Sequence, residues 1–162
     1  MPEDIGAIDP NWAWSTFKPS TEQPWNRRLA AHLCRRAGFG ATSRELNDLV
    51  KQSPAEIAHA FVENAKQASQ RDPETDSLAT AMLATGNSQN LAAWWLHRML
   101  NSPWSGGEAA STSPLLEKLT LFWHGHFATG AEKVDDAEMM FTQNQLLRHH
   151  ALGNFGAMTQ EI

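Results

Sequence analysis

The sequence predicts an all-α protein, an irregular bundle of about six to seven helices with an extended, aromatic-rich arm at its N-terminal end. Three observations predict this fold. Apolar residues recur at helical spacing along most of the chain, the helical runs begin at N-cap residues or prolines, and no window shows the alternation of a strand. The length of 162 residues suits one domain, so we expect an arm over residues 1–24 and a helical domain over residues 25–162.

Residues 1–24 predict no regular secondary structure. Four prolines interrupt any helix in this segment. Trp12, Trp14 and Phe17 are spaced along it, and Trp25 follows directly. We expect an extended arm that lays its aromatic side chains over the domain.

The first three helices are predicted over residues 25–37, 42–51 and 53–69. Gly38 is expected to end the first of them in the left-handed conformation. The other two begin at capping boxes, in which an N-cap Ser or Thr and a Glu three residues later each bond the other's backbone N–H. These boxes are Thr42 with Glu45 and Ser53 with Glu56.

The second half predicts a polar loop and four more helical runs. Residues 70–88 read as a loop with a helical turn near residues 77–84. The runs cover residues 89–101, 114–127 and 136–152, and a further helix begins after Asn154. The stretch LAAWWLHRML is apolar almost all round, which predicts that the helix over residues 89–101 is central and buried.

The stretch EKLTLFWHGHF, residues 117–127, places His124 and His126 beside Trp123. On a strand, side chains two residues apart share a face and could bind one metal ion, whereas on a helix they lie about 200° apart. The apolar spacing of residues 115–123 favours a helix, with His126 in its buried arc and His124 facing solvent. A metal site at these two histidines remains the alternative, and the sequence assigns no cofactor.

Arg98 lies in the nearly all-apolar stretch over residues 91–100. A buried arginine needs a carboxylate partner, and Glu117 is the predicted one. We interpret this pair as structural rather than catalytic. Trp94 and Trp95 could stack on a sugar, but core packing is the favoured interpretation.

Other polar residues suggest simpler roles. Arg28 and Arg35 share a helix face, where a solvated basic surface is favoured over an anion site. Cys34 lacks a base partner and is interpreted as a small apolar residue. Asp135 and Asp136 are expected to cap the helix that follows them.

Charge and composition exclude several classes of protein. The net charge of −5 argues against a nucleic-acid partner, including a helix-turn-helix reading of residues 25–69. A single cysteine excludes an intrachain disulfide and a cysteine-based zinc cluster. No signal peptide is recognisable, and no apolar run reaches the roughly 18 residues that could span a membrane. We therefore expect a cytoplasmic protein.

Several stretches together resemble the N-terminal part of the bacterial domain-of-unknown-function family numbered 1800, with an aromatic lead-in most similar to its planctomycete branch. The most specific are RRAGFGAT and EKLTLFWHGHFAT. The resemblance begins near residue 9, and it implies a helical fold without implying an activity, a cofactor or catalytic residues. Family members run longer, so the resemblance also implies a truncated member that exposes apolar helix faces.

Two functional hypotheses follow. The first is a non-catalytic scaffold or interaction domain, or an incomplete piece of one, that binds a protein partner or a second copy through exposed aromatic faces. The second is the N-terminal half of a metal-dependent hydrolase-like enzyme with ligands in the region of His124 and His126. Whether the protein is an enzyme is left open by the sequence.

Overall fold

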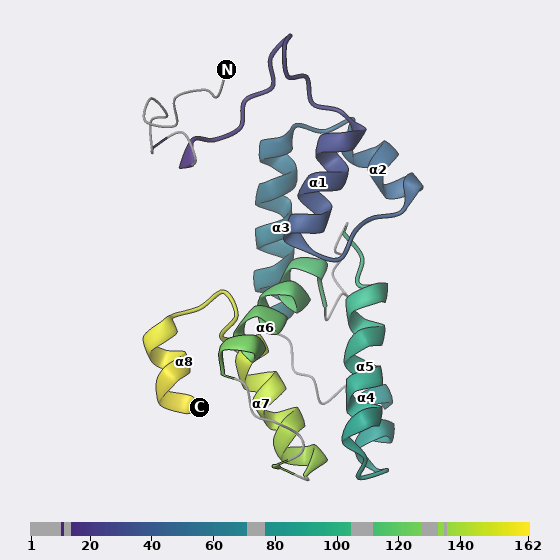
Figure 1. The fold of residues 1–162 in the computed structure, drawn as a ribbon, viewed down its shortest axis with the longest axis vertical. Helices are drawn as coiled ribbons and strands as arrows, with labels where there is room; N and C mark the ends of the chain where they lie inside the picture. The colour runs from purple at the N-terminus through teal and green to yellow at the C-terminus, as the bar shows by residue number, and fades with distance from the viewer. Residues whose placement is uncertain (1–10, 12–13, 71–76, 105–111, 128–132, 135) are drawn as a thin grey trace, which may run out of the picture.

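The computed structural model describes residues 11, 14–70, 77–104, 112–127, 133–134 and 136–162, and over these residues the protein is all-α, with eight helices and no strand (Figure 1). The helices are α1 Arg27–Ala37, α2 Ser43–Leu49, α3 Pro54–Ser69, α4 Ser77–Leu83, α5 Ser88–Asn101, α6 Pro114–His126, α7 Ala137–His149 and α8 Phe155–Glu161. The predicted fold class is confirmed. The count exceeds the prediction because the turn expected near residues 77–84 is a helix of its own, α4.

The helix starts follow the predicted capping chemistry. In α2, the Thr42 hydroxyl accepts from the Glu45 N–H at 3.3 Å, and the Glu45 carboxylate accepts from the Thr42 N–H at 2.7 Å. The same reciprocal box begins α3 at Ser53. Side-chain oxygens of the residues just before α6, α7 and α8 also accept backbone N–H groups, and these N-caps are Ser113, Asp136 and Asn154. Local sequence therefore determines where these helices begin.

Gly38 ends α1, but not in the predicted left-handed conformation. Its φ of −164° is extended backbone that any residue adopts. The physical reason for glycine is space, since a Cβ at this position would lie 2.8 Å from both the Pro114 Cβ and the Trp104 ring. Gly38 is thus the place where the end of α1 meets the start of α6.

The molecule has two tiers that α6 joins. In Figure 1, α1, α2 and α3 lie together at the top, and α4, α5 and α7 lie below them. Helix α6 contacts α1 and α3 of the upper tier and α5 and α7 of the lower tier. Its Leu116 is fully buried against Ala65 and Ala68 of α3 and Ala151. The lower tier packs around Trp94 of α5, and the upper tier has its own apolar cluster.

The prediction of a central, buried helix over residues 89–101 is wrong for one of the two faces of that helix. Helix α5 buries one face, through Leu91, Trp94 and Arg98. On its other face Leu96 is 54% exposed and Leu100 is 69% exposed. An all-apolar stretch does not reveal which of its sides meets the rest of the protein, and α6 is the helix that contacts both α1 and α3 and both α5 and α7.

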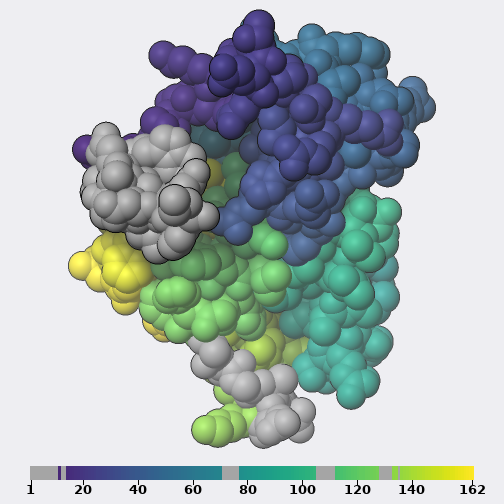
Figure 2. Space-filling model, turned by 45° about the horizontal axis from the view of Figure 1, so that its top comes forward, coloured from purple at the N-terminus to yellow at the C-terminus, as the bar shows by residue number. Residues whose placement is uncertain are grey.

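The segment before α1 contributes less cover than expected. Residues 15–24 contain no helix or strand, and Figure 2 shows the purple segment lying over the blue helices that follow it. Phe17 contacts Trp25 with ring centroids 6.4 Å apart, but Trp14 is 89% exposed. Trp12 lies outside the described residues. No helix among the described residues is long and apolar enough to cross a membrane.

Candidate functional site

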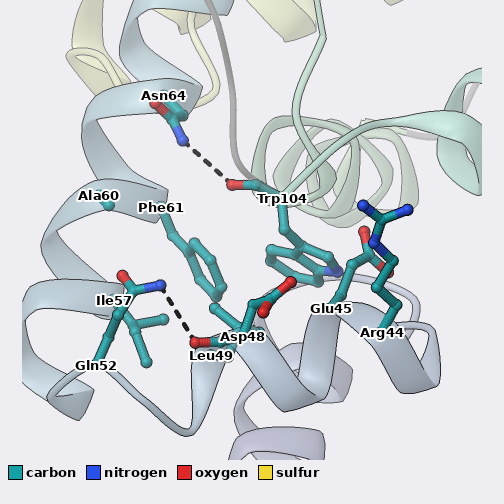
Figure 3. A pocket seen from close by; sticks show the side chains of 10 residues that line it. All are labelled: Arg44, Glu45, Asp48, Leu49, Gln52, Ile57, Ala60, Phe61, Asn64 and Trp104. Carbon is teal, nitrogen blue, oxygen red and sulfur yellow. Dashed lines mark hydrogen bonds between the residues drawn. The ribbon is translucent and has the colours of Figure 1, made fainter.

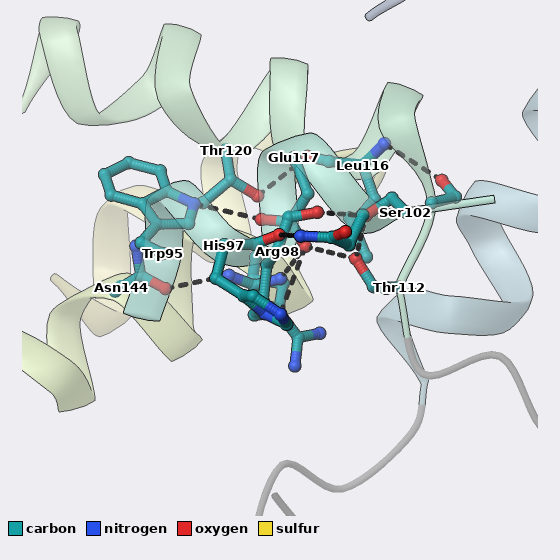
Figure 4. A network of polar contacts seen from close by, with 12 residues as sticks. Trp95, His97, Arg98, Ser102, Thr112, Leu116, Glu117, Thr120 and Asn144 are labelled. Atoms are coloured by element: carbon teal, nitrogen blue, oxygen red, sulfur yellow. Dashed lines mark hydrogen bonds and ion pairs between the residues drawn. The ribbon is translucent and has the colours of Figure 1, made fainter. Parts of the chain in front are cut away.

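A buried polar network around Glu117 joins α5, α6 and α7 (Figure 4). The Glu117 side chain is fully buried, in the first turn of α6. Its Oε2 accepts the indole N–H of Trp95 at 2.9 Å. Its Oε1 accepts the Thr112 hydroxyl at 2.6 Å, the Arg98 Nε at 3.4 Å and a short contact from Arg148 Nη1. One carboxylate thus binds three segments of the chain together.

Both arginines of the network lie near the ring of Trp94. The guanidinium carbons of Arg98 and Arg148 lie 5.3 Å and 5.6 Å from the centroid of the Trp94 ring, within cation–π range. Arg148 also donates to the Asn144 side chain, one turn earlier on α7, at 3.0 Å. Because Trp94 is 1% exposed, its faces are used inside the core, and the ring is closed to a sugar.

The electrostatics of the network keep Glu117 ionised. Burial on its own raises the pKa of a carboxyl group, but the positive charges of Arg148 and Arg98, with hydrogen bonds from Arg148 and Thr112, outweigh that effect and lower the pKa of Glu117. A carboxylate held below its ordinary pKa and surrounded by donors is a poor proton acceptor. The arrangement is suited to joining helices and not to acid–base chemistry.

Sequence reasoning found part of this network. The predicted pairing of Arg98 with Glu117 is present, at 3.4 Å. Arg148, Thr112 and the Trp95 N–H were missed. Arg148 carried a weak signal, because it lies four residues after Asn144 on the side of α7 that also holds apolar Leu147. Nothing in the sequence indicated that this side of α7 reaches Glu117.

The two histidines of α6 exchange their predicted environments. His126 is exposed, with its ring 4.5 Å from that of Phe122. His124 is half-buried beside Trp95, at a ring distance of 5.1 Å, and burial lowers its pKa. The prediction of a buried His126 is wrong because α5 packs against the side of α6 that the apolar spacing assigned to solvent.

Within the described part of the chain, His124 and His126 do not come together in a metal site. Helix α6 continues through both histidines to His126, so their rings lie on different sides of it. Among the described residues, no group of three or more His, Cys, Asp or Glu side chains could hold a metal ion. The hydrolase hypothesis needs two converging rings, and the helix separates them.

The remaining candidate residues that the structure describes are buried, cap a helix or lie on the surface. Cys34 is fully buried, and burial raises the pKa of its thiol to about 11, so the thiol stays protonated near neutral pH. Asp136 caps α7 by accepting from the backbone N–H groups of Glu138 and Met139. Asp135 lies outside the described residues. Arg28 and Arg35 lie on the exposed side of α1.

A pocket of about 460 Å³ opens between α2 and α3, against Phe61 and Trp104 (Figure 3). Most of the polar side chains at its rim already form hydrogen bonds or ion pairs within the protein. Glu45 belongs to the capping box of α2, Asp48 pairs with Lys51 at 2.7 Å, and Asn64 donates to the Trp104 carbonyl at 3.2 Å. Few of the rim groups are therefore left to recognise a ligand.

An exposed group of rings lies where the end of α6 meets α8. We call it the aromatic surface, and it consists of Phe122, Trp123, His126, Phe127 and Phe155. Trp123 is its centre, with the Phe155 ring 5.6 Å away and its indole N–H donating to the Ala151 carbonyl at 3.2 Å. Phe122 and Phe155 are 51% and 57% exposed. The structure thus holds adjacent aromatic rings toward solvent.

Comparison with known proteins gives one match. A protein-family model described as "Protein of unknown function (DUF1800)" matches residues 32–162, which include every described residue of the Glu117 network and of the aromatic surface. Neither the curated proteins nor the solved structures contain a match to the chain.

Proposed function

The chain belongs to the DUF1800 family of proteins of unknown function, and from that premise we propose that it is a non-catalytic helical interaction domain. Its aromatic surface would bind a protein partner, and the partner that can be tested directly is a second copy of the chain. The aromatic surface is the observation that carries the proposal. Aromatic side chains are enriched at protein interfaces because they bury a large apolar area with few rotatable bonds.

The Glu117 network supports the same proposal from the interior. The buried Arg98 of α5 and the buried Arg148 of α7 both pair with Glu117, so the network connects α6 to α5 and to α7. This fixes the helix that carries most of the aromatic surface. A surface held in one conformation loses less conformational entropy on binding than a mobile one.

The test is sedimentation velocity over a concentration series. The Phe122→Ser/Phe155→Ser variant should remain monomeric at concentrations where the wild-type chain associates, because the two most exposed phenylalanines of the surface are removed. The control variant is Leu100→Ser, which removes a side chain that is 69% exposed on α5, outside the aromatic surface. It should associate as the wild type does.

Two results would contradict the proposal of self-association. One is a wild-type chain that stays monomeric throughout the series. The other is equal association of the double variant and the wild type. Far-UV circular dichroism of every variant shows whether the helices are retained, which separates loss of association from loss of fold.

A further inference from the structure

A second pocket, of about 440 Å³, shares no lining residue with the pocket of Figure 3, and we call it the α1–α3 groove. Helix α1 and the first turns of α3 form its walls, and the segment before α1 closes one side. Its lining residues are Thr16, Phe17, Trp25, Leu29, His32, Leu33, Arg36, Pro54, Ala55 and Ala58. The volume falls within the roughly 300–1,000 Å³ of small-molecule sites.

The chemistry of the α1–α3 groove is divided between an apolar interior and a basic edge. Seven of the ten lining residues are apolar, and Thr16, His32 and Arg36 are the exceptions. Without a set of donors and acceptors, the groove does not suit a sugar or another polyhydroxylated ligand. It suits an alkyl or aromatic chain.

The basic edge is available to a ligand. Among the described residues, the side chains of His32 and Arg36 make no hydrogen bond or ion pair, and both are exposed. Arg28 and Arg35 lie on the same helix, so α1 concentrates positive charge in a chain whose net charge is −5. An exposed arginine that lines an apolar groove complements a carboxylate, which it can bind through two parallel hydrogen bonds.

We propose that the α1–α3 groove binds a free, medium-chain alkyl carboxylate. The alkyl chain lies between Leu29, Leu33 and Ala58, and the carboxylate is bound by Arg36. The helical rise places Arg36 about 10 Å along α1 from Leu29, which sets the scale of the chain between the apolar end and the charge. This site shares no residue with the aromatic surface, so the proposal of a carboxylate site does not depend on the proposed interaction domain.

The first experiment is isothermal titration calorimetry of the full chain with monomeric decanoate. Arg36→Ala should weaken binding about tenfold, the effect of losing one charge-assisted contact. The matched control is Arg35→Ala, which removes the same charge from the same helical turn but does not line the groove. It should change the affinity by less than about twofold. Equal effects of the two variants would overturn the proposal, because only general charge would then matter.

A second variant pair tests the apolar part. Ala58→Trp should abolish decanoate binding by filling the groove, whereas His59→Trp, at an exposed neighbouring position of α3 outside the groove, should leave it intact. Both positions are exposed, so neither variant should disturb the core. Binding that survives Ala58→Trp would overturn the placement of the ligand.

The ligand series completes the test. Octanoate should bind more weakly than decanoate, by up to about fourfold per methylene lost, and decanol should bind more weakly because it lacks the charge. Decanol binding as tightly as decanoate would contradict recognition of the carboxylate. Binding to anionic phosphatidylserine vesicles without binding to monomeric decanoate would also overturn the proposal, in favour of a membrane surface.

Discussion

Glu117 is the carboxylate at the centre of the buried network that joins α5, α6 and α7. Two guanidinium groups share its carboxylate, and all three side chains are at least nine-tenths buried. Buried ion pairs contribute little net stability compared with apolar packing, but removing one partner leaves charges uncompensated in a poorly solvated place. The network should therefore be sensitive to loss of its single anion.

Glu117→Gln should destabilise the protein by about 3–5 kcal/mol, because Arg98 and Arg148 would stay buried without their counter-ion. Urea unfolding followed by circular dichroism measures the change. The control is Glu63→Gln, which removes an exposed carboxylate paired with Lys66 on α3 and should have no measurable effect. A Glu117→Gln variant as stable as the control would show that the network does not stabilise the fold.

Some helix ends are determined by local sequence and others by tertiary packing. Capping boxes begin α2 and α3 where the sequence predicts them, because an N-cap side chain bonds a backbone N–H three residues away. The end of α1 has a different cause. Gly38 lies there because Trp104 and Pro114, which are distant in sequence, leave no room for a Cβ.

Two glycine substitutions should therefore change stability in opposite directions. Gly38→Ala should cost about 1–3 kcal/mol by steric conflict with the Trp104 ring and Pro114. Gly125→Ala lies inside α6 with no atom within 4 Å of the added Cβ, and it should stabilise the protein by up to about 1 kcal/mol. Thermal unfolding of both variants gives the comparison. Equal shifts of the same sign would contradict the packing described at Gly38.

Helix α6 makes the two tiers one structure. It contacts α1 and α3 above and α5 and α7 below, and it carries Glu117, Leu116 and most of the aromatic surface. Interior charge, core packing and exposed rings are thus arranged on different sides of one helix. A change in the ionisation of Glu117 should consequently affect the stability of the whole molecule.

Stability should fall in acid, and part of the loss should belong to Glu117. The folded pKa of Glu117 lies below its ordinary value of 4.5, so its stabilisation is fully present above the unfolded pKa and is lost as pH falls through the folded pKa. Urea unfolding from about pH 7 to about pH 3 measures the free energy of unfolding of the wild type and of Glu117→Gln. The difference between these two free energies should become smaller at the acid end. A difference of constant size would contradict the assigned shift.

Local patterns predicted the fold class, the starts of most helices and the Arg98–Glu117 pairing, and the resemblance of longer stretches to known sequences predicted the family. The local patterns failed where a prediction needed to know which helix packs against which side. The burial of His126, the burial of α5 and the left-handed Gly38 were each inferred from a single stretch of chain, whereas the burial of a side chain depends on neighbours from elsewhere in the sequence.

The sequence by itself determined that the chain is helical, where α2, α3 and α6 begin, and that Arg98 needs an anion. Helix capping depends on residues only a few positions apart, and the need for charge compensation depends on the arginine itself. The tertiary structure alone decided that Arg148 shares Glu117, that His124 is covered by Trp95 while His126 is exposed, and that Gly38 admits no Cβ. These features depend on the packing of α6 among helices that lie far from it in the sequence.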